Sequence, residues 1–176
     1  GCCSNLVHLP ANLSGKKITN ADSLFVMDSS LINIPTSFNP EKLYQCGGIF
    51  RGCSALISIP LINVSNASSY HDMVSGCTNL EDFKFKGIGN IAQIEKFSYQ
   101  DFTSCTSVSE TMIASMVYTM NNVYDRSSAT YDYTFKITTA LYNALKASTY
   151  YTGTDTQYDT FRSVMNSQNH YKVVAQ

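Results

Sequence analysis

Large apolar residues recur along the first 108 positions at nearly constant spacing. A Leu or Val returns after steps of 25, 25, 24 and 28 residues, and another apolar residue follows three positions later in four copies. The aligned positions are Leu6, Leu31, Leu56, Leu80 and Val108, followed by Leu9, Ile34, Ile59 and Phe83. A Pro comes next at positions 10, 35 and 60, and Lys84 replaces it in the fourth copy. We interpret this pattern as a structural unit repeated along the chain.

The period predicts a leucine-rich repeat solenoid of the α/β class, with short parallel strands and irregular return arms. One copy cannot bury its apolar stripe alone, so stacked copies would share one core. We expect an array of about four repeats of roughly 25 residues over 1–106. The array starts partway through a repeat, so its first turn should expose an apolar edge. Alternation at Phe83 and Phe85 predicts a longer strand or a hairpin in the fourth copy.

Residues 107–176 depart from the repeat and predict a C-terminal α/β cap packed on the array. Helical spacing of apolar residues predicts a helix over about 108–124, with Ser107 and Glu110 as a capping box. Strict alternation predicts a half-buried strand over 131–137. The other expected elements are helices over 138–149 and 155–169 and a short strand over 170–175.

Composition and charge argue against several classes of partner. Of 176 residues, 12 are basic and 13 acidic, without a block of like charge, so neither nucleic acid nor anionic lipid is favoured. The longest apolar stretches are too short to span a bilayer, and we expect no membrane insertion of this segment. The sequence has neither an initiator Met nor a basic-then-apolar leader, which predicts a fragment of a longer chain.

The cysteines follow the repeat more closely than any disulfide or zinc pattern. Cys3, Cys53, Cys77 and Cys105 each stand three positions before the aligned Leu or Val. This shared phase predicts free thiols buried at a tight corner of each turn. Disulfides between neighbouring turns, metal binding and catalysis are the alternatives. Cys2 and Cys46 fall out of phase and receive no role.

No metal or cofactor is expected from the sequence. It contains no Cys-x-x-Cys pair, and its three histidines lie at no spacing that completes a zinc set.

The repeats resemble those of BspA-type leucine-rich repeat proteins. The stretch from Phe50 to Pro60 matches the pattern F-x-G-C-S-x-L-x-x-I-P, typical of the variant in gut-bacterial surface proteins and prophage tail-fibre-like proteins. The stretch "LEDFKFKGIG" at 80–89 and the helix after it are similar to the end of such arrays. His170-Tyr171 stands where that family often has Gly-Trp. The resemblance implies a place on a cell surface or on a virion.

His71 and Asp72 are the only adjacent pair of histidine and carboxylate. A nucleophilic site would also need an oriented Ser or Cys and an oxyanion hole, which no motif marks. We therefore expect a solvated loop pair and assign no catalytic residue. The 12 tyrosines suit a binding face, although many can complete the core, so ligand-binding residues stay unassigned. Tyrosines in polar loops are Tyr124, Tyr131, Tyr150, Tyr151 and Tyr158.

The function expected is that of a non-enzymatic module of a cell-surface or phage-derived protein, acting in adhesion or protein–protein recognition. Its partner would be a protein or glycan on a host or neighbouring cell surface, and its location would be extracellular or virion-associated. A glycan-binding module is the alternative hypothesis. An enzyme is the third and least favoured hypothesis, because a catalytic site would need clustered titratable residues and the sequence shows none. The oligomeric state does not follow from the sequence.

Overall fold

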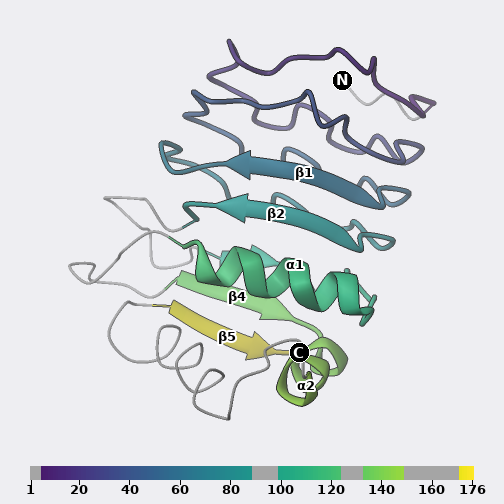
Figure 1. Ribbon diagram of the computed structural model, residues 1–176, viewed down its shortest axis with the longest axis vertical. Helices are drawn as coiled ribbons and strands as arrows, with labels where there is room; N and C mark the ends of the chain where they lie inside the picture. Colours follow the sequence, from purple (N-terminus) through teal and green to yellow (C-terminus); the bar gives the residue numbers. More distant parts are fainter. Residues whose placement is uncertain (1–4, 89–98, 124–132, 149–170) are drawn as a thin grey trace.

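A computed structural model describes residues 5–88, 99–123, 133–148 and 171–176 of the chain. Five strands form two parallel sheets, a pair β1–β2 and a triplet in the order β3–β4–β5. The strands are β1 (Ser58–Asn63), β2 (Asp82–Lys86), β3 (Tyr99–Asp101), β4 (Tyr133–Ile137) and β5 (Tyr171–Ala175). The helices are α1 (Glu110–Asn121) and α2 (Thr139–Ala147). Successive turns of the chain lie one below another, from the N-terminal end towards β5 (Figure 1).

The predicted leucine-rich repeat solenoid is wrong as a fold class. The described residues form a small mixed α/β fold with two short, separate parallel sheets and two helices. Before β1 the parallel β-bridges of the described chain are isolated, such as His8 with Asn33. Backbone hydrogen bonds still join successive turns there, as from the amide of Phe25 to the carbonyl of Ile49 at 2.9 Å. The recurring Pro carries no N–H for a ladder and disturbs the pairing locally, although β1 forms with Pro60 inside it. Where Lys84 replaces it, β2 forms a regular strand, whereas the β1–β2 register shifts around Pro60.

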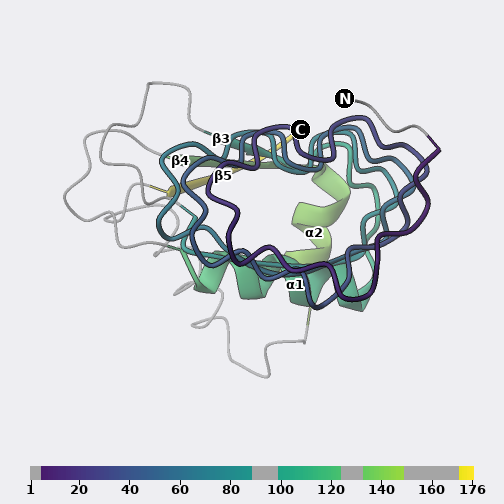
Figure 2. The same ribbon diagram turned by 90° about the horizontal axis from the view of Figure 1, so that it is seen from above.

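The sequence period nevertheless corresponds to neighbouring stretches of chain. The amide of Ile32 donates to the carbonyl of Val7 at 3.2 Å, and that of Ile57 donates to Ile32 at 2.7 Å. Seen from above (Figure 2), α1 runs along one long side of the molecule, and β3, β4 and β5 lie on the opposite side. The expected domain boundary near residue 106 stays a prediction.

Aligned apolar residues are less buried in the first described turn than in the second. Leu6, Leu9 and Leu13 are half-buried, whereas the residues 25 positions later in the next turn are buried. Those later residues are Leu31, Ile34 and Phe38. The core is therefore closed from the second turn onwards and partly open at the first.

Two hydroxyl groups of α1 end the β1–β2 sheet. The amides of Phe83 and Phe85 in β2 donate to Ser115 Oγ at 3.1 Å and to Thr119 Oγ1 at 3.2 Å. Both side chains are buried and stand one helical turn apart. In a β-strand, the amides of every second residue point to the same edge. Two hydroxyl groups at positions i and i+4 of a helix can therefore accept hydrogen bonds from two such amides. α1 thus takes the place of a further strand beside β2.

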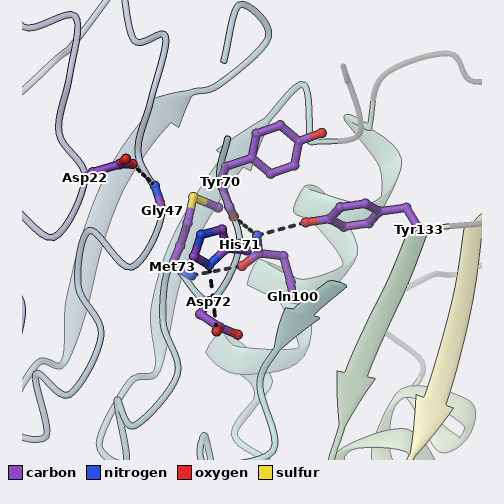
Figure 3. A network of polar contacts seen from close by, with 8 residues as sticks. All are labelled: Asp22, Gly47, Tyr70, His71, Asp72, Met73, Gln100 and Tyr133. Atoms are coloured by element: carbon purple, nitrogen blue, oxygen red, sulfur yellow. Dashed lines mark hydrogen bonds and ion pairs between the residues drawn. The ribbon is translucent and has the colours of Figure 1, made fainter. Parts of the chain in front are cut away.

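A buried glutamine makes the corresponding connection on the other side of the molecule. Gln100 in β3 accepts a hydrogen bond from the amide of Met73 through Oε1 at 3.2 Å. Its Nε2 donates to the carbonyl of Tyr70 and, at 2.9 Å, to the hydroxyl of Tyr133 in β4. One side chain therefore joins the last turn before β3 to the three-stranded sheet (Figure 3).

The hydrophobic core continues from the turns into the C-terminal elements through aromatic contacts. The ring of Phe102 lies 5.2 Å from that of Phe83 in β2 and 6.4 Å from that of Phe135 in β4, measured between centroids. In the earlier turns, the rings of Phe25 and Phe50 stack at 5.7 Å. These aromatic residues are buried, so both sheets pack against one core.

The C-terminal elements follow the apolar pattern with shifted boundaries. The helices expected over 108–124 and 138–149 appear as α1 and α2, and the strands expected over 131–137 and 170–175 as β4 and β5. The capping box was misplaced, because Ser109 is the N-cap of α1 and accepts from the amide of Met112 at 3.1 Å. The helix expected over 155–169 lies outside the described residues, as does the region after Ile88 where a hairpin was possible.

The prediction of free, buried thiols is confirmed for Cys53, Cys77 and Cys105. Cys53 Sγ donates to the carbonyl of Phe25 at 2.9 Å, and Cys77 Sγ to that of Phe50 at 3.1 Å. Cys53 and Cys77 thus each donate to a carbonyl of the preceding turn. Cys3 lies outside the described residues.

Cys46, which had no assigned role, is also buried and free. Its Sγ donates to the carbonyl of Ser69 at 3.5 Å. Burial raises the pKa of Cys46, Cys53 and Cys105 to about 12, and it also raises that of Cys77. These thiols therefore stay protonated and are poor nucleophiles at neutral pH.

Removing one of the hydroxyls that end the sheet should destabilise the protein. In Thr119→Val the side chain keeps its shape but leaves the amide of Phe85 buried without an acceptor, which costs about 1–3 kcal/mol. Thr111→Val, at an exposed position of the same helix, should change stability by less than about 0.5 kcal/mol. Urea denaturation followed by circular dichroism measures both. Equal stability of the two variants would contradict the role given to Thr119.

Stability should fall as the solution becomes alkaline. Thiols of the unfolded chain ionise above about pH 8.5, whereas Cys46, Cys53 and Cys105 in the folded chain stay protonated until about pH 12. The unfolded state then binds fewer protons, so the free energy of unfolding decreases, by at most about 1.4 kcal/mol per pH unit for each thiol. Urea midpoints at pH 7.5, 8.5 and 9.5 under reducing conditions test this. A Cys53→Ala variant should show a shallower decrease, and a flat profile for the unsubstituted chain would refute it.

Candidate binding face and groove

Apolar side chains form an exposed column on the side of the molecule that carries β1. We call the column of Val7, Ile32 and Ile57, together with Leu61 further along β1, the strand face. Ile57 and Leu61 are 46% and 43% exposed, Val7 is exposed and Ile32 is half-buried. Val7, Ile32 and Ile57 each follow a Leu of the repeat, so when the Leu points into the core they point outwards. Backbone hydrogen bonds between their turns place these three in register.

A groove of about 660 Å³ lies beside the strand face, between β2 and α1. It exists because α1, a wider element than a strand, occupies the position next to β2 (Figure 1). Asp82 and Lys84 come from the exposed side of β2, where alternate residues point away from the core. From α1 the groove is lined by Glu110, Thr111, Ala114, Tyr118 and Asn121, among others.

The polar groups of the groove are held by hydrogen bonds and ring contacts. Asp82 Oδ1 accepts from Ser115 Oγ at 3.3 Å, which orients this carboxylate. Lys84 Nζ lies 6.0 Å from the centroid of the half-buried Tyr118 ring, at the outer range of a cation–π contact. With Glu110, the groove combines two carboxylates, one ammonium group and one aromatic ring.

A smaller hollow of about 380 Å³ lies beside the strand face. Ile57 belongs to its wall, and Glu81 stands next to Asp82 in the chain. Ser107, before the start of α1, forms another part of the wall. The strand face adjoins the groove directly at Leu61, which pairs with Lys84 in the β1–β2 sheet.

His71 and Asp72 lie on a different part of the described chain, in the turn over 70–77 (Figure 3). The distance from His71 Nδ1 to Asp72 Oδ2 is 3.8 Å, and the imidazole is 64% exposed. The ring lies beside Gly47, whose amide donates to Asp22 Oδ1 at 2.5 Å. The expectation of a solvated loop pair therefore holds for His71 only, because the side chain of Asp72 is 19% exposed.

Metal ligands and a membrane span were also sought among the described residues. Within those ranges, His, Cys, Asp and Glu form no group of three or more that could hold a metal ion. The described helices include none that is both long and apolar enough to cross a bilayer.

Tyr118 is the groove residue that the sequence pattern missed. The tyrosines singled out in polar loops, Tyr124, Tyr131, Tyr150, Tyr151 and Tyr158, lie outside the described residues. A usable signal existed, because Tyr118 stands four positions after Ala114 on one side of the predicted helix. The facing strand, however, cannot be identified from that spacing. Comparison of the chain with family models, with curated proteins and with solved structures gave no match.

Proposed function

We propose that the chain is a non-enzymatic recognition module of a cell-surface or phage-derived protein, acting in adhesion or protein–protein recognition. The strand face is the observation that carries the proposal. Neighbouring extended segments lie about 4.8 Å apart, so Val7, Ile32 and Ile57 form a continuous narrow strip rather than scattered exposed residues. Such a strip suits the apolar centre of a protein interface.

Polar side chains beside the strip support this proposal. His8, Asn33 and Ser58, which bridge one another through the backbone, follow directly after Val7, Ile32 and Ile57. Protein interfaces commonly combine an apolar centre with a polar rim that keeps the free surface soluble. Burying a fully exposed Ile or Leu is worth about 1.5–3 kcal/mol, so Ile57 and Leu61, which are 46% and 43% exposed, can each contribute roughly half of that.

The described thiols and the His71–Asp72 pair are weak candidates for catalysis. The thiols stay protonated and satisfy carbonyls inside the molecule. The imidazole of His71 is mostly exposed, so its surroundings do little to orient it towards a reacting group. The sequence resemblance to BspA-type proteins directs the proposal to a cell surface or a virion.

Acidic substitutions on the strand face should weaken cell binding. We expect fluorescently labelled chain to bind members of a panel of bacterial and epithelial cells, and Ile57→Asp with Leu61→Asp to weaken this binding about tenfold or more. Flow cytometry over a concentration series gives the apparent affinity. Protease treatment of the cells should remove the binding sites if the ligand is a protein.

Leu24→Asp is the matched control, because Leu24 is 40% exposed in the turn over 21–28, outside the strand face. It should leave cell binding unchanged, and circular dichroism should show that every variant is folded. Equal loss in the control and the double variant, or no loss in either, would refute a role for the strand face. Failure of the unsubstituted chain to bind any cell would refute adhesion.

A further inference from the structure

We infer that the groove between β2 and α1 binds an uncharged saccharide, with the ring of Tyr118 as its stacking surface. The groove adjoins the strand face but shares no residue with it. The inference therefore rests on the proposed recognition function only in assuming that this side of the molecule faces a ligand. It adds a second class of ligand at a separate subsite.

The size and lining of the groove fit a sugar better than an apolar ligand. A volume of about 660 Å³ falls within the range of small-molecule sites and accommodates about one or two sugar rings. A sugar ring has an apolar C–H face that can stack on Tyr118 and hydroxyl groups that need hydrogen-bond partners. Apart from Tyr118, the apolar lining is limited to Ala114 and Val117, and Val117 is only 6% exposed. A largely apolar ligand would find little surface here.

Hydrogen bonds hold both walls of the groove in place before any ligand arrives. Ser115 Oγ accepts from the amide of Phe83 and donates to Asp82, so β2, α1 and the carboxylate are linked at one point. At the far end, the amide of Gly87 donates to the carbonyl of Asn122 at 2.7 Å, just after α1. A site on two connected elements loses little conformational entropy on binding.

The charges in the groove select against anionic sugars. The carboxylates of Asp82 and Glu110 would repel a uronic acid, a sialic acid or a phosphate, and Lys84 offsets only one of them. Carboxylates are strong acceptors for hydroxyl donors, and the ammonium group donates to ring or hydroxyl oxygens. The same groups therefore suit an uncharged hexose or N-acetylhexosamine.

The test begins with the whole chain on an array of neutral and acidic glycans. We expect neutral glycans to be bound in preference, and titration calorimetry with the best free saccharide then gives the affinity. Tyr118→Ala should weaken that affinity about tenfold or more, whereas Tyr118→Phe, which keeps the ring, should stay within about threefold. Asp82→Ala should also weaken it about tenfold.

Tyr44→Ala is the matched control, since Tyr44 is 59% exposed and lies outside the groove lining. It should bind the saccharide like the unsubstituted chain. If Tyr118→Ala is unfolded by circular dichroism, Asp82→Ala and Lys84→Met, both at exposed positions of β2, carry the test instead. Retained affinity in the folded groove variants would overturn the inference.

The failure of this inference and of the proposed function can be told apart. If no glycan binds, or only anionic glycans bind, the saccharide inference is overturned, while loss of cell binding in the Ile57 and Leu61 double variant still supports the strand face. If the double variant binds both the saccharide and the cells as well as the unsubstituted chain does, the strand face is refuted and the groove stands. Periodate treatment of cells, which destroys vicinal diols, should reduce only the binding that depends on Tyr118.

Discussion

The need to satisfy the backbone amides at the end of a parallel sheet governs how this molecule is built. β2 presents amides on the edge away from β1, and a buried amide without an acceptor costs about 1–3 kcal/mol. Ser115 and Thr119 supply these acceptors from a helix, and Gln100 serves the amide of Met73 across the molecule. Together with Asp28, these three side chains are the buried polar or charged ones in the described ranges, apart from tyrosines and cysteines.

The same solution creates the groove. A strand beside β2 would have continued the sheet, whereas α1 is broader than a strand and leaves a recess against the outward side chains of β2. Ser115 takes part in both arrangements, because it accepts from the amide of Phe83 and donates to Asp82 in the groove wall. The end of the sheet and the candidate binding site are therefore consequences of one helix position.

The turns before β1 are held together by a different set of contacts. Their β-bridges are isolated, but alternate amides donate to carbonyls of the next turn, as from Phe25 to Ile49 and from Phe50 to Met73, both at 2.9 Å. Buried thiols and aromatic rings add further contacts between the turns. Thiols suit this position because they are small, apolar and able to donate one weak hydrogen bond to a carbonyl. Backbone hydrogen bonds away from the Pro positions, together with these side chains, thus join the early turns.

The apolar period of the sequence alone determined which residues occupy equivalent positions in successive turns. It correctly placed Cys53 and Cys77 as buried free thiols, and helical and alternating spacing located α1, α2, β4 and β5. These features depend on side-chain periodicity, which is local in sequence.

Only the tertiary structure decided how the backbone edges are paired, and therefore the fold class. The contacts of Phe83 with Ser115 and of Phe85 with Thr119 join residues 32 and 34 positions apart, and no spacing in the sequence relates them. Tyr118 faces Lys84 for the same reason, because the helix that carries it was placed by those long-range hydrogen bonds. A period specifies which side chains point inwards, whereas the partner of each exposed amide depends on segments that meet only in the folded chain.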